Sequence, residues 1–229
     1  MYEREKRKKN SRRRRRRRRI LIRRMLIFCM AAALVLAGTG IYVCIQKFRS
    51  VDIVLDAGHG GKDQGASAGN VLEKEINLEI TKKTKKILEE AGYRVGMVRD
   101  NDTFVELGQR AAYANQKEAR VFVSIHCNSA EEAADGIETF YAEQKEAESQ
   151  ELAQCIQEHM IGRTSARDRE VKTADYAVIL RTDMPAALTE VGFLSDAAEC
   201  EALQQEVYQE KLAEGIAEGI LTYLQNHDI

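Results

Sequence analysis

The stretch Asp56-Ala57-Gly58-His59-Gly60-Gly61 follows directly after the apolar run 51–55 and places a histidine inside a glycine-rich turn. The run predicts a buried strand, because it carries no charge after Asp52. The glycines let the backbone turn sharply and approach a ligand closely. Open α/β sheets bind ligands at the carboxyl ends of their strands, so His59 lies where such a fold places chemistry. Taken alone, His59 is better explained as a capping or core histidine, and only partners elsewhere reverse that preference.

From residue 51 onward, apolar runs alternate with long amphipathic stretches, which is the pattern of an α/β fold built on βα units. We predict a single three-layer domain over 47–229, with a mixed, mostly parallel sheet flanked by helices. Strands are predicted at 51–56, 93–99, 121–126, 136–141, 176–181 and 186–191. Helices are predicted at 74–90, 106–118, 147–161 and 206–225.

The net charge of −1 hides two parts of opposite sign. Residues 1–50 carry 17 Lys and Arg against Glu3 and Glu5, whereas residues 51–229 carry 18 against 34 acids. Within the basic part, the 21 residues of 25–45 contain no charge, which matches the length that a membrane-spanning helix needs.

Positive charge directly before an apolar span predicts that the N-terminus stays in the cytoplasm. We therefore predict a basic cytoplasmic segment at 1–24 and a transmembrane signal anchor at 25–46. This arrangement makes a single-pass protein of the cell membrane, with its domain on the extracytoplasmic side. A cleaved signal peptide is the alternative, because small residues occupy 37–40, but the apolar run exceeds the length of a signal h-region.

The arginine run 12–19 is also typical of basic arms that bind nucleic acid. Its position against the apolar span explains it through topology and attraction to anionic lipid headgroups. No nucleic-acid partner is therefore predicted. Three cysteines without CxxC spacing follow the span, and a Cys155–Cys200 bridge and two buried thiols both stay open.

Two histidines occupy strand ends. His126 closes the run 121–125, as His59 follows 51–55, so both are expected at the same edge of the sheet. A catalytic zinc site commonly has two histidines, one carboxylate and an open position for water. Glu73 is the best third ligand, because it follows the glycine loop and opens the first helix, although a helix-start acid is more often a cap.

Glu190 is the second acid of interest, because it ends the predicted strand 186–191 and closely precedes Gly192. A carboxylate near a metal can act as general base toward water. An exposed glutamate at a strand end is the equally supported alternative. Arg181, at the end of the predicted strand 176–181, is a hypothesis for a contact with substrate carboxylates.

Four short motifs occur in order along the domain. They are Asp56-Ala57-Gly58-His59-Gly60-Gly61, Glu73-Lys74-Glu75-Ile76-Asn77-Leu78, Ser124-Ile125-His126-Cys127-Asn128 and Glu190-Val191-Gly192-Phe193-Leu194-Ser195. In this order they resemble the motifs of the zinc-dependent N-acetylmuramoyl-L-alanine amidases of the Amidase_3 type. The resemblance extends over almost all of residues 51–225.

The resemblance implies that His59, Glu73 and His126 bind Zn²⁺ and that Glu190 is the catalytic general base. It also implies the reaction, which is hydrolysis of the amide between N-acetylmuramic acid and L-alanine in peptidoglycan, in cell-wall or spore-cortex remodelling. The short architecture resembles the germination-type spore-cortex amidases of muramic-lactam formation, but general cell-separation amidases share it. The sequence does not show whether an activating protein is needed.

Departures from the family pattern leave every implied ligand in place. Ala57 stands where proline is frequent, Asp196 lies near a common asparagine, and Cys127 replaces a small or apolar residue. Cys127 is disfavoured as a ligand, because neighbouring strand residues point to opposite faces. His159 is assigned to a helix face and His227 to the frayed tail. Two functions compete with the amidase interpretation. One is a membrane-tethered protein that binds peptidoglycan without cutting it, and the other is a zinc peptidase of other peptidoglycan specificity.

Overall fold

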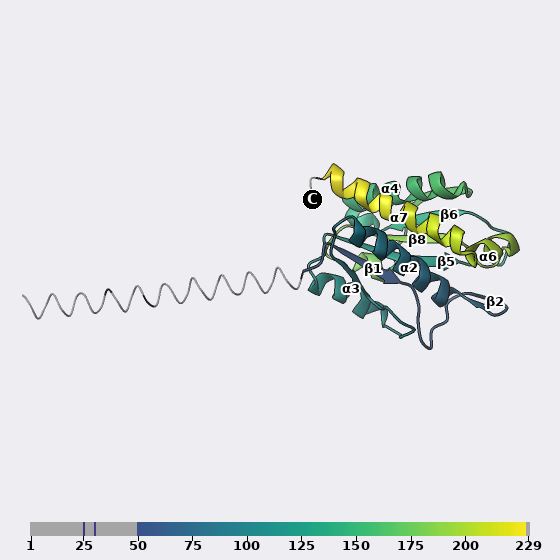
Figure 1. Cartoon of the computed structure of the whole chain (residues 1–229), viewed down its shortest axis with the longest axis horizontal. Helices are drawn as coiled ribbons and strands as arrows, with labels where there is room; N and C mark the ends of the chain where they lie inside the picture. Colours follow the sequence, from purple (N-terminus) through teal and green to yellow (C-terminus); the bar gives the residue numbers. More distant parts are fainter. Residues whose placement is uncertain (1–24, 26–29, 31–49, 228–229) are drawn as a thin grey trace, which may run out of the picture. The chain divides into compact units, whose positions relative to one another are not determined.

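The computed structural model describes residues 50–227 together with Met25 and Met30 (Figure 1). Residues 50–229 form one compact unit, which is described here by itself. The predicted cytoplasmic segment and nearly all of the predicted anchor lie outside the described residues. Among the residues that are described, no helix has the length and apolar character needed to cross a membrane.

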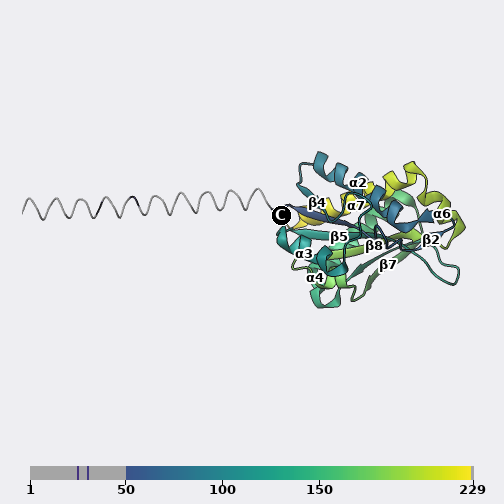
Figure 2. The ribbon, with the colours of Figure 1, turned by 90° about the horizontal axis from the view of Figure 1, so that it is seen from below.

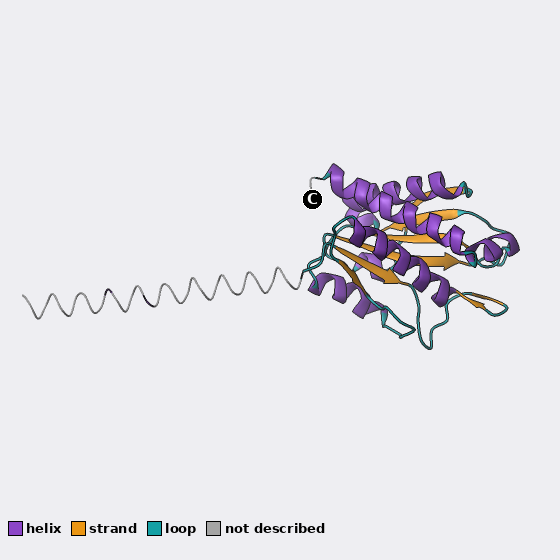
Figure 3. Ribbon diagram, viewed as in Figure 1, coloured by secondary structure: helices purple, strands orange, loops and turns teal. Residues whose placement is uncertain are grey.

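A six-stranded sheet runs through the domain in the order β4-β1-β5-β8-β6-β7 (Figure 3). Its strands are β1 (Ile53–Ala57), β4 (Val95–Met97), β5 (Val121–Asn128), β6 (Ile137–Tyr141), β7 (Asp168–Thr173) and β8 (Ala186–Phe193). Neighbouring strands are parallel except for β6 and β8, which are antiparallel. The prediction of a mixed, mostly parallel sheet is confirmed.

Helices cover both faces of this sheet (Figures 1 and 2). They are α2 (Glu73–Glu90), α3 (Leu107–Gln116), α4 (Glu146–Thr164), α5 (Ala177–Leu180), α6 (Ala197–Leu203) and α7 (Glu206–Asn226), with a 3-10 turn at Glu143–Lys145. Residues of α2, α4 and α7 share a core with one face, and residues of α3 and α5 share a core with the other. Strand β1 lies between both cores, which explains the apolar run 53–55, and its one charged residue, Asp56, is buried against Arg110.

The prediction of a strand at 176–181 is wrong. Residues Ala177–Leu180 form the short helix α5, which buries Val178 and Ile179 against the sheet. Its apolar, β-branched residues have the composition of a strand, and tertiary packing overrides that propensity. Glu190 is the fifth of the eight residues of β8 and does not end the strand.

Three elements were not predicted: β7, α6 and the hairpin of β2 (Ser67–Ala68) with β3 (Val71–Leu72). Strand β7 lies at the edge of the sheet and is largely polar, so it lacks the apolar run that marks the central strands. The hairpin strands have two residues each, which is too short for a periodic signal. The hairpin nevertheless matters, because β3 leads directly into α2 and its first residue, Glu73.

Cys155, Cys200, His159 and His227 lie away from the predicted metal ligands in the sequence, and the structure gives each a contact or burial of its own. Cys155 and Cys200 are buried free thiols, so no bridge joins them. His159 donates from Nδ1 to the Cys155 carbonyl at 2.8 Å, as expected for a helix-face residue. The assignment of His227 to a frayed tail is wrong, because its Nε2 lies 3.1 Å from Oε2 of Glu151.

Candidate metal centre

The structure brings His59, Glu73 and His126 together. Nε2 of His59 lies 3.2 Å from Oε1 of Glu73, and Nδ1 of His126 lies 3.0 Å from the same oxygen. One ligand atom from each residue lies within 4.8 Å of the other two. The two imidazole rings meet edge to face, with their centroids 4.9 Å apart. Loop, helix start and strand thus supply one donor each.

Two glycines make this close approach possible. A Cβ atom on Gly58 would lie 2.3 Å from Cε1 of His126, and one on Gly65 would lie 2.4 Å from Oε2 of Glu73. Gly65 also has φ +67, which disfavours any side chain. Gly58 and Gly65 are therefore required for packing, since a larger residue at either position would push the candidate metal-binding side chains apart.

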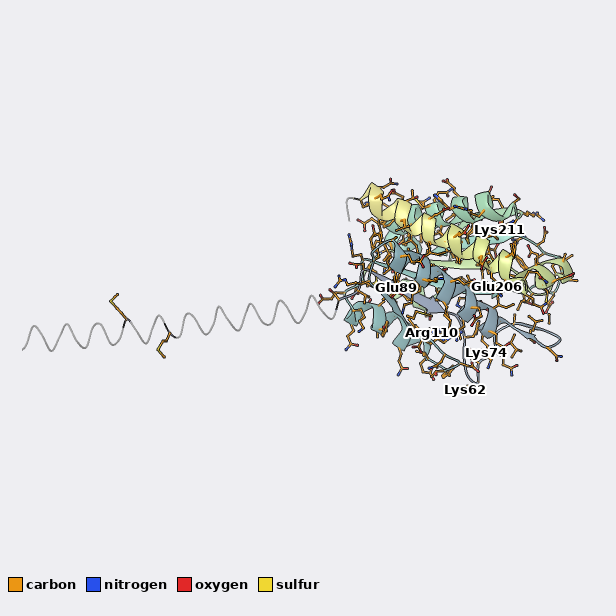
Figure 4. The ribbon with its side chains drawn as sticks, in the orientation of Figure 1. Lys62, Lys74, Glu89, Arg110, Glu206 and Lys211 are labelled. Atoms are coloured by element: carbon orange, nitrogen blue, oxygen red, sulfur yellow. The ribbon has the colours of Figure 1, made fainter. Side chains whose placement is uncertain are left out.

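Buried basic side chains hold the loop that carries His59. The backbone of His59 lies in the left-handed region, with φ +59. Arg110 donates from Nη2 to the His59 carbonyl and from Nη1 to Oδ1 of Asp56, both at 2.7 Å. Arg99 and Lys74 donate to other carbonyls of the same loop. Figure 4 labels Lys74 on α2 and Arg110 on α3. These bonds stabilise a backbone conformation that costs free energy for a residue other than glycine.

Glu73 is buried, and both of its carboxylate oxygens accept hydrogen bonds. Its Oε2 accepts a hydrogen bond from the Ala66 amide at 2.7 Å, and its Oε1 accepts one from Nδ2 of Asn77 at 3.0 Å. Burial raises the pKa of Glu73, but hydrogen bonds from His126 and His59 outweigh it and hold the pKa well below its usual range. Glu73 is therefore a carboxylate, the form in which a glutamate binds metal.

Cys127 is turned away from the three donors. Its Sγ donates to Oδ1 of Asn77 at 3.4 Å, and only its backbone amide reaches Glu73. Burial raises the pKa of the thiol well above its usual value, which opposes the thiolate that metals bind. The expectation that neighbouring strand residues face opposite ways agrees with this placement.

Asp63 was not singled out by the sequence, yet its Oδ2 lies 2.9 Å from Nδ1 of His59. Burial lowers the pKa of His59, but Glu73 and Asp63 raise it to about 9. The centre therefore favours positive charge between these groups. A carboxylate on the second ring nitrogen is the usual way in which proteins orient a metal-binding histidine.

Glu190 faces the same centre from β8, opposite His126 on β5 and Glu138 on β6. Its Oε2 is buried and accepts no hydrogen bond from the described residues. Burial raises the pKa of Glu190 to about 7, with Glu73 and Glu138 adding to the rise and His126 opposing it. An unpartnered carboxylate that titrates near neutral pH has the properties of a general base.

A cavity of about 280 Å³ opens in front of these groups. Its lining includes the polar residues His59, Asp63, Arg110, His126 and Glu190 and the apolar residues Leu107, Tyr176, Ala177, Val178 and Leu188. Neither Leu107 nor Tyr176 is marked by the sequence pattern, because an apolar residue in the predicted helix 106–118 or in the predicted strand 176–181 looks like a core position. Arg181 lies beyond this lining, exposed at the end of α5 rather than at a strand end.

The donor set is suited to a zinc ion. Two atoms bound to one tetrahedral zinc at about 2.0–2.1 Å lie about 3.3 Å apart, and the two histidine nitrogens lie at similar distances, 3.2 and 3.0 Å, from Oε1 of Glu73. The two histidine nitrogens themselves lie within 4.8 Å of one another. Two histidines and a glutamate beside a cavity, with a second glutamate unpaired, form the arrangement typical of mononuclear metal hydrolases.

Comparison with known proteins specifies the class further. Residues 53–222 match the Amidase_3 family, which is described as N-acetylmuramoyl-L-alanine amidase. The chain belongs to this family. The resemblance inferred from the four motifs is thereby confirmed.

Solved structures of amidases share the fold. The N-acetylmuramoyl-L-alanine amidase from Clostridium difficile 630 is 38% identical with a TM-score of 0.75, and the match covers 77% of this chain and 98% of that one. The CwlD amidase from Clostridioides difficile, in complex with the GerS lipoprotein, is 36% identical with a TM-score of 0.74, over 77% and 100% of the two chains. A germination-specific N-acetylmuramoyl-L-alanine amidase from Bacillus subtilis (strain 168) is 35% identical over an alignment of 187 positions, which covers 75% of this chain and 78% of the relative.

Proposed function

We propose that this chain is a zinc-dependent amidase that hydrolyses the bond between N-acetylmuramic acid and L-alanine in peptidoglycan. His59, Glu73 and His126 hold the zinc, and Glu190 is the general base. The observation that carries this proposal is the free Oε2 of Glu190, which is buried beside the cavity that His59 and His126 also line. The scissile bond follows from the names of the relatives.

Each residue has a defined part in the reaction. When bound, zinc polarises the scissile carbonyl and makes water more acidic. Glu190 takes a proton from the attacking water and delivers it to the alanine nitrogen as the C–N bond breaks. The water oxygen ends on the lactyl carbonyl carbon, so the products are a glycan strand whose N-acetylmuramic acid carries a free lactyl carboxylate and a peptide with an N-terminal alanine. Asp63, whose Oδ2 lies 2.9 Å from Nδ1 of His59 without the geometry of a hydrogen bond, adds negative charge beside the ring.

Digestion of purified peptidoglycan by the full chain tests this function. We expect new N-terminal alanine, measured by labelling free amino groups and identifying the labelled residue. A chelator should abolish the release, and added zinc should restore it, because removal of the metal leaves His59, Glu73 and His126 without the ion that activates water.

The same digestion separates the competing functions. New N-termini other than alanine would indicate a zinc peptidase, and binding without any new terminus would indicate a scaffold. Parallel digestion of spore-cortex and vegetative peptidoglycan tests the narrower proposal, suggested by the germination-specific relative, that cortex is the preferred substrate.

We also propose that residues 25–46 anchor the chain in the cell membrane, with the domain on the extracytoplasmic side. The uncharged run and the arginines before it support this proposal. Full-length protein should remain with membranes after high-salt and carbonate washes, at its unprocessed mass, and external protease should reach its domain. Recovery of a shortened, washable protein would favour the cleaved signal peptide instead.

A further inference from the structure

Large apolar side chains are rarely exposed in the described domain, and two of them lie at the cavity. Leu107 is 58% exposed and Tyr176 is 42% exposed, and both belong to the cavity that also contains Glu190. The remaining one, Val207, is 66% exposed on α7, whose helix packs on the opposite face of the sheet. Exposed apolar residues beside a catalytic group are typical of a surface that a ligand covers.

The structure braces the Tyr176 ring. Leu107 is the first residue of α3, and Tyr176 is the N-cap residue of the neighbouring helix α5. The Tyr176 ring meets Phe140 edge to face, with the ring centroids 5.3 Å apart. A braced aromatic ring offers apolar contact at a small cost in side-chain entropy. The aromatic part of the rim is therefore preformed.

Arg181, at the other end of α5, differs from the other exposed arginines of the described domain. Those three, Arg94, Arg163 and Arg167, each pair with a carboxylate. Arg181 pairs with none of the described residues. Its Nη1 lies 3.6 Å from the position that a Cβ would take on Gly108, the neighbour of Leu107. A free guanidinium thus lies close to the apolar rim.

Charge favours the peptide side of the substrate. The glycan strand offers few anionic groups once its lactyl carboxyls are amidated, whereas stem peptides carry free carboxylates. Consecutive Cα atoms lie about 3.8 Å apart, so a guanidinium beside Gly108 lies about one residue beyond Leu107 at the cavity. A peptide that leaves the cavity past Leu107 can therefore bring its next carboxylate to Arg181.

We propose that the stem peptide lies across the ends of α3 and α5, with Leu107 and Tyr176 against its apolar part and Arg181 on the carboxylate of the residue after the alanine. This inference rests on the proposed amidase function and assigns the peptide subsite of the same centre. Arg181 then acts as a specificity residue that distinguishes a free carboxylate from a carboxamide at that position.

Two matched muropeptides test the subsite with the full, zinc-loaded chain. They differ only in whether the second stem residue carries a free carboxylate or a carboxamide. Wild-type protein should cleave the carboxylate form with a kcat/KM roughly 3- to 10-fold higher, mainly through KM, because the ion pair is solvent-exposed. Arg181→Gln should abolish this preference, and Arg181→Lys should restore part of it.

Matched controls lie on α7. Lys211→Gln removes an exposed cation there (Figure 4) and should keep the wild-type preference. Leu107→Ala should lower kcat/KM for both muropeptides by a similar factor, whereas Val207→Ala should change neither. An unchanged carboxylate preference in Arg181→Gln would overturn the peptide subsite. Failure of wild-type protein to release alanine from either muropeptide would instead overturn the amidase function on which the subsite rests.

Discussion

Replacing Glu190 with glutamine is expected to lower the rate of alanine release roughly 10²- to 10⁴-fold while leaving the zinc content unchanged. Glutamine keeps the size of the side chain but cannot accept the proton of the attacking water. The three donor residues lie on other elements, so the metal should stay. Release of N-terminal alanine and zinc by elemental analysis are measured on the same preparation.

The same substitution should stabilise the metal-free protein at pH 8. Burial raises the pKa of Glu190 from 4.5 to about 7, so ionising this carboxyl costs the fold free energy. The cost grows as the pH rises from the unfolded pKa to the folded pKa, so it is absent at pH 4 and complete at pH 8. Glu190→Gln should therefore gain on the order of 2 kcal/mol, or several degrees in Tm, at pH 8 and nothing at pH 4.

Glu75→Gln, on the exposed side of α2, is the matched control and should change neither activity nor Tm appreciably. Near-normal alanine release by Glu190→Gln would remove Glu190 from the mechanism. Loss of zinc together with activity would instead make it a ligand.

His126→Ala is expected to lose both zinc and activity. Nδ1 of His126 lies 3.0 Å from the Glu73 oxygen that also faces His59, so its removal leaves two of the three donors. Loss of a partner that merely orients a ligand costs metal affinity about 10- to 100-fold, and loss of a ligand should cost more. Competition with a chromophoric chelator measures the affinity directly.

His159→Ala serves as the control, because His159 lies on α4 with Cys155 and Thr222 as its partners. It should bind zinc as tightly as wild-type protein. If His126→Ala keeps wild-type zinc affinity, the proposed ligand set is wrong even if the enzyme is an amidase.

The positions of the three proposed metal-binding residues follow from the sequence, because they depend on where the strands end. His59 and His126 follow apolar runs that become β1 and β5, and neighbouring parallel strands end at the same edge. Glu73 follows because it opens the helix after the glycine loop. These relations depend on chain order and hydrophobic pattern, both of which are visible without coordinates.

The supporting contacts could not be predicted in the same way. Arg110 reaches His59 as a buried cation and Asp63 reaches it from a partly exposed loop position, and neither the helix pattern nor the loop composition indicates these contacts. The sequence predicts a strand at 176–181, whereas the structure has Tyr176 as the N-cap residue of α5. The position of Tyr176 at the cavity therefore could not be predicted. The raised pKa of Glu190 comes mainly from burial, and Glu138, which a cross-strand register brings opposite it, adds a smaller rise.

Zinc-edge anomalous diffraction from crystals of the zinc-loaded protein locates the metal independently of activity. We expect one zinc ion bound by His59, Glu73 and His126 within about 2.0–2.2 Å of each donor, on the side of the cavity that Glu190 faces. A zinc ion on other residues, with these three donors bound only to one another, would contradict the proposed metal centre.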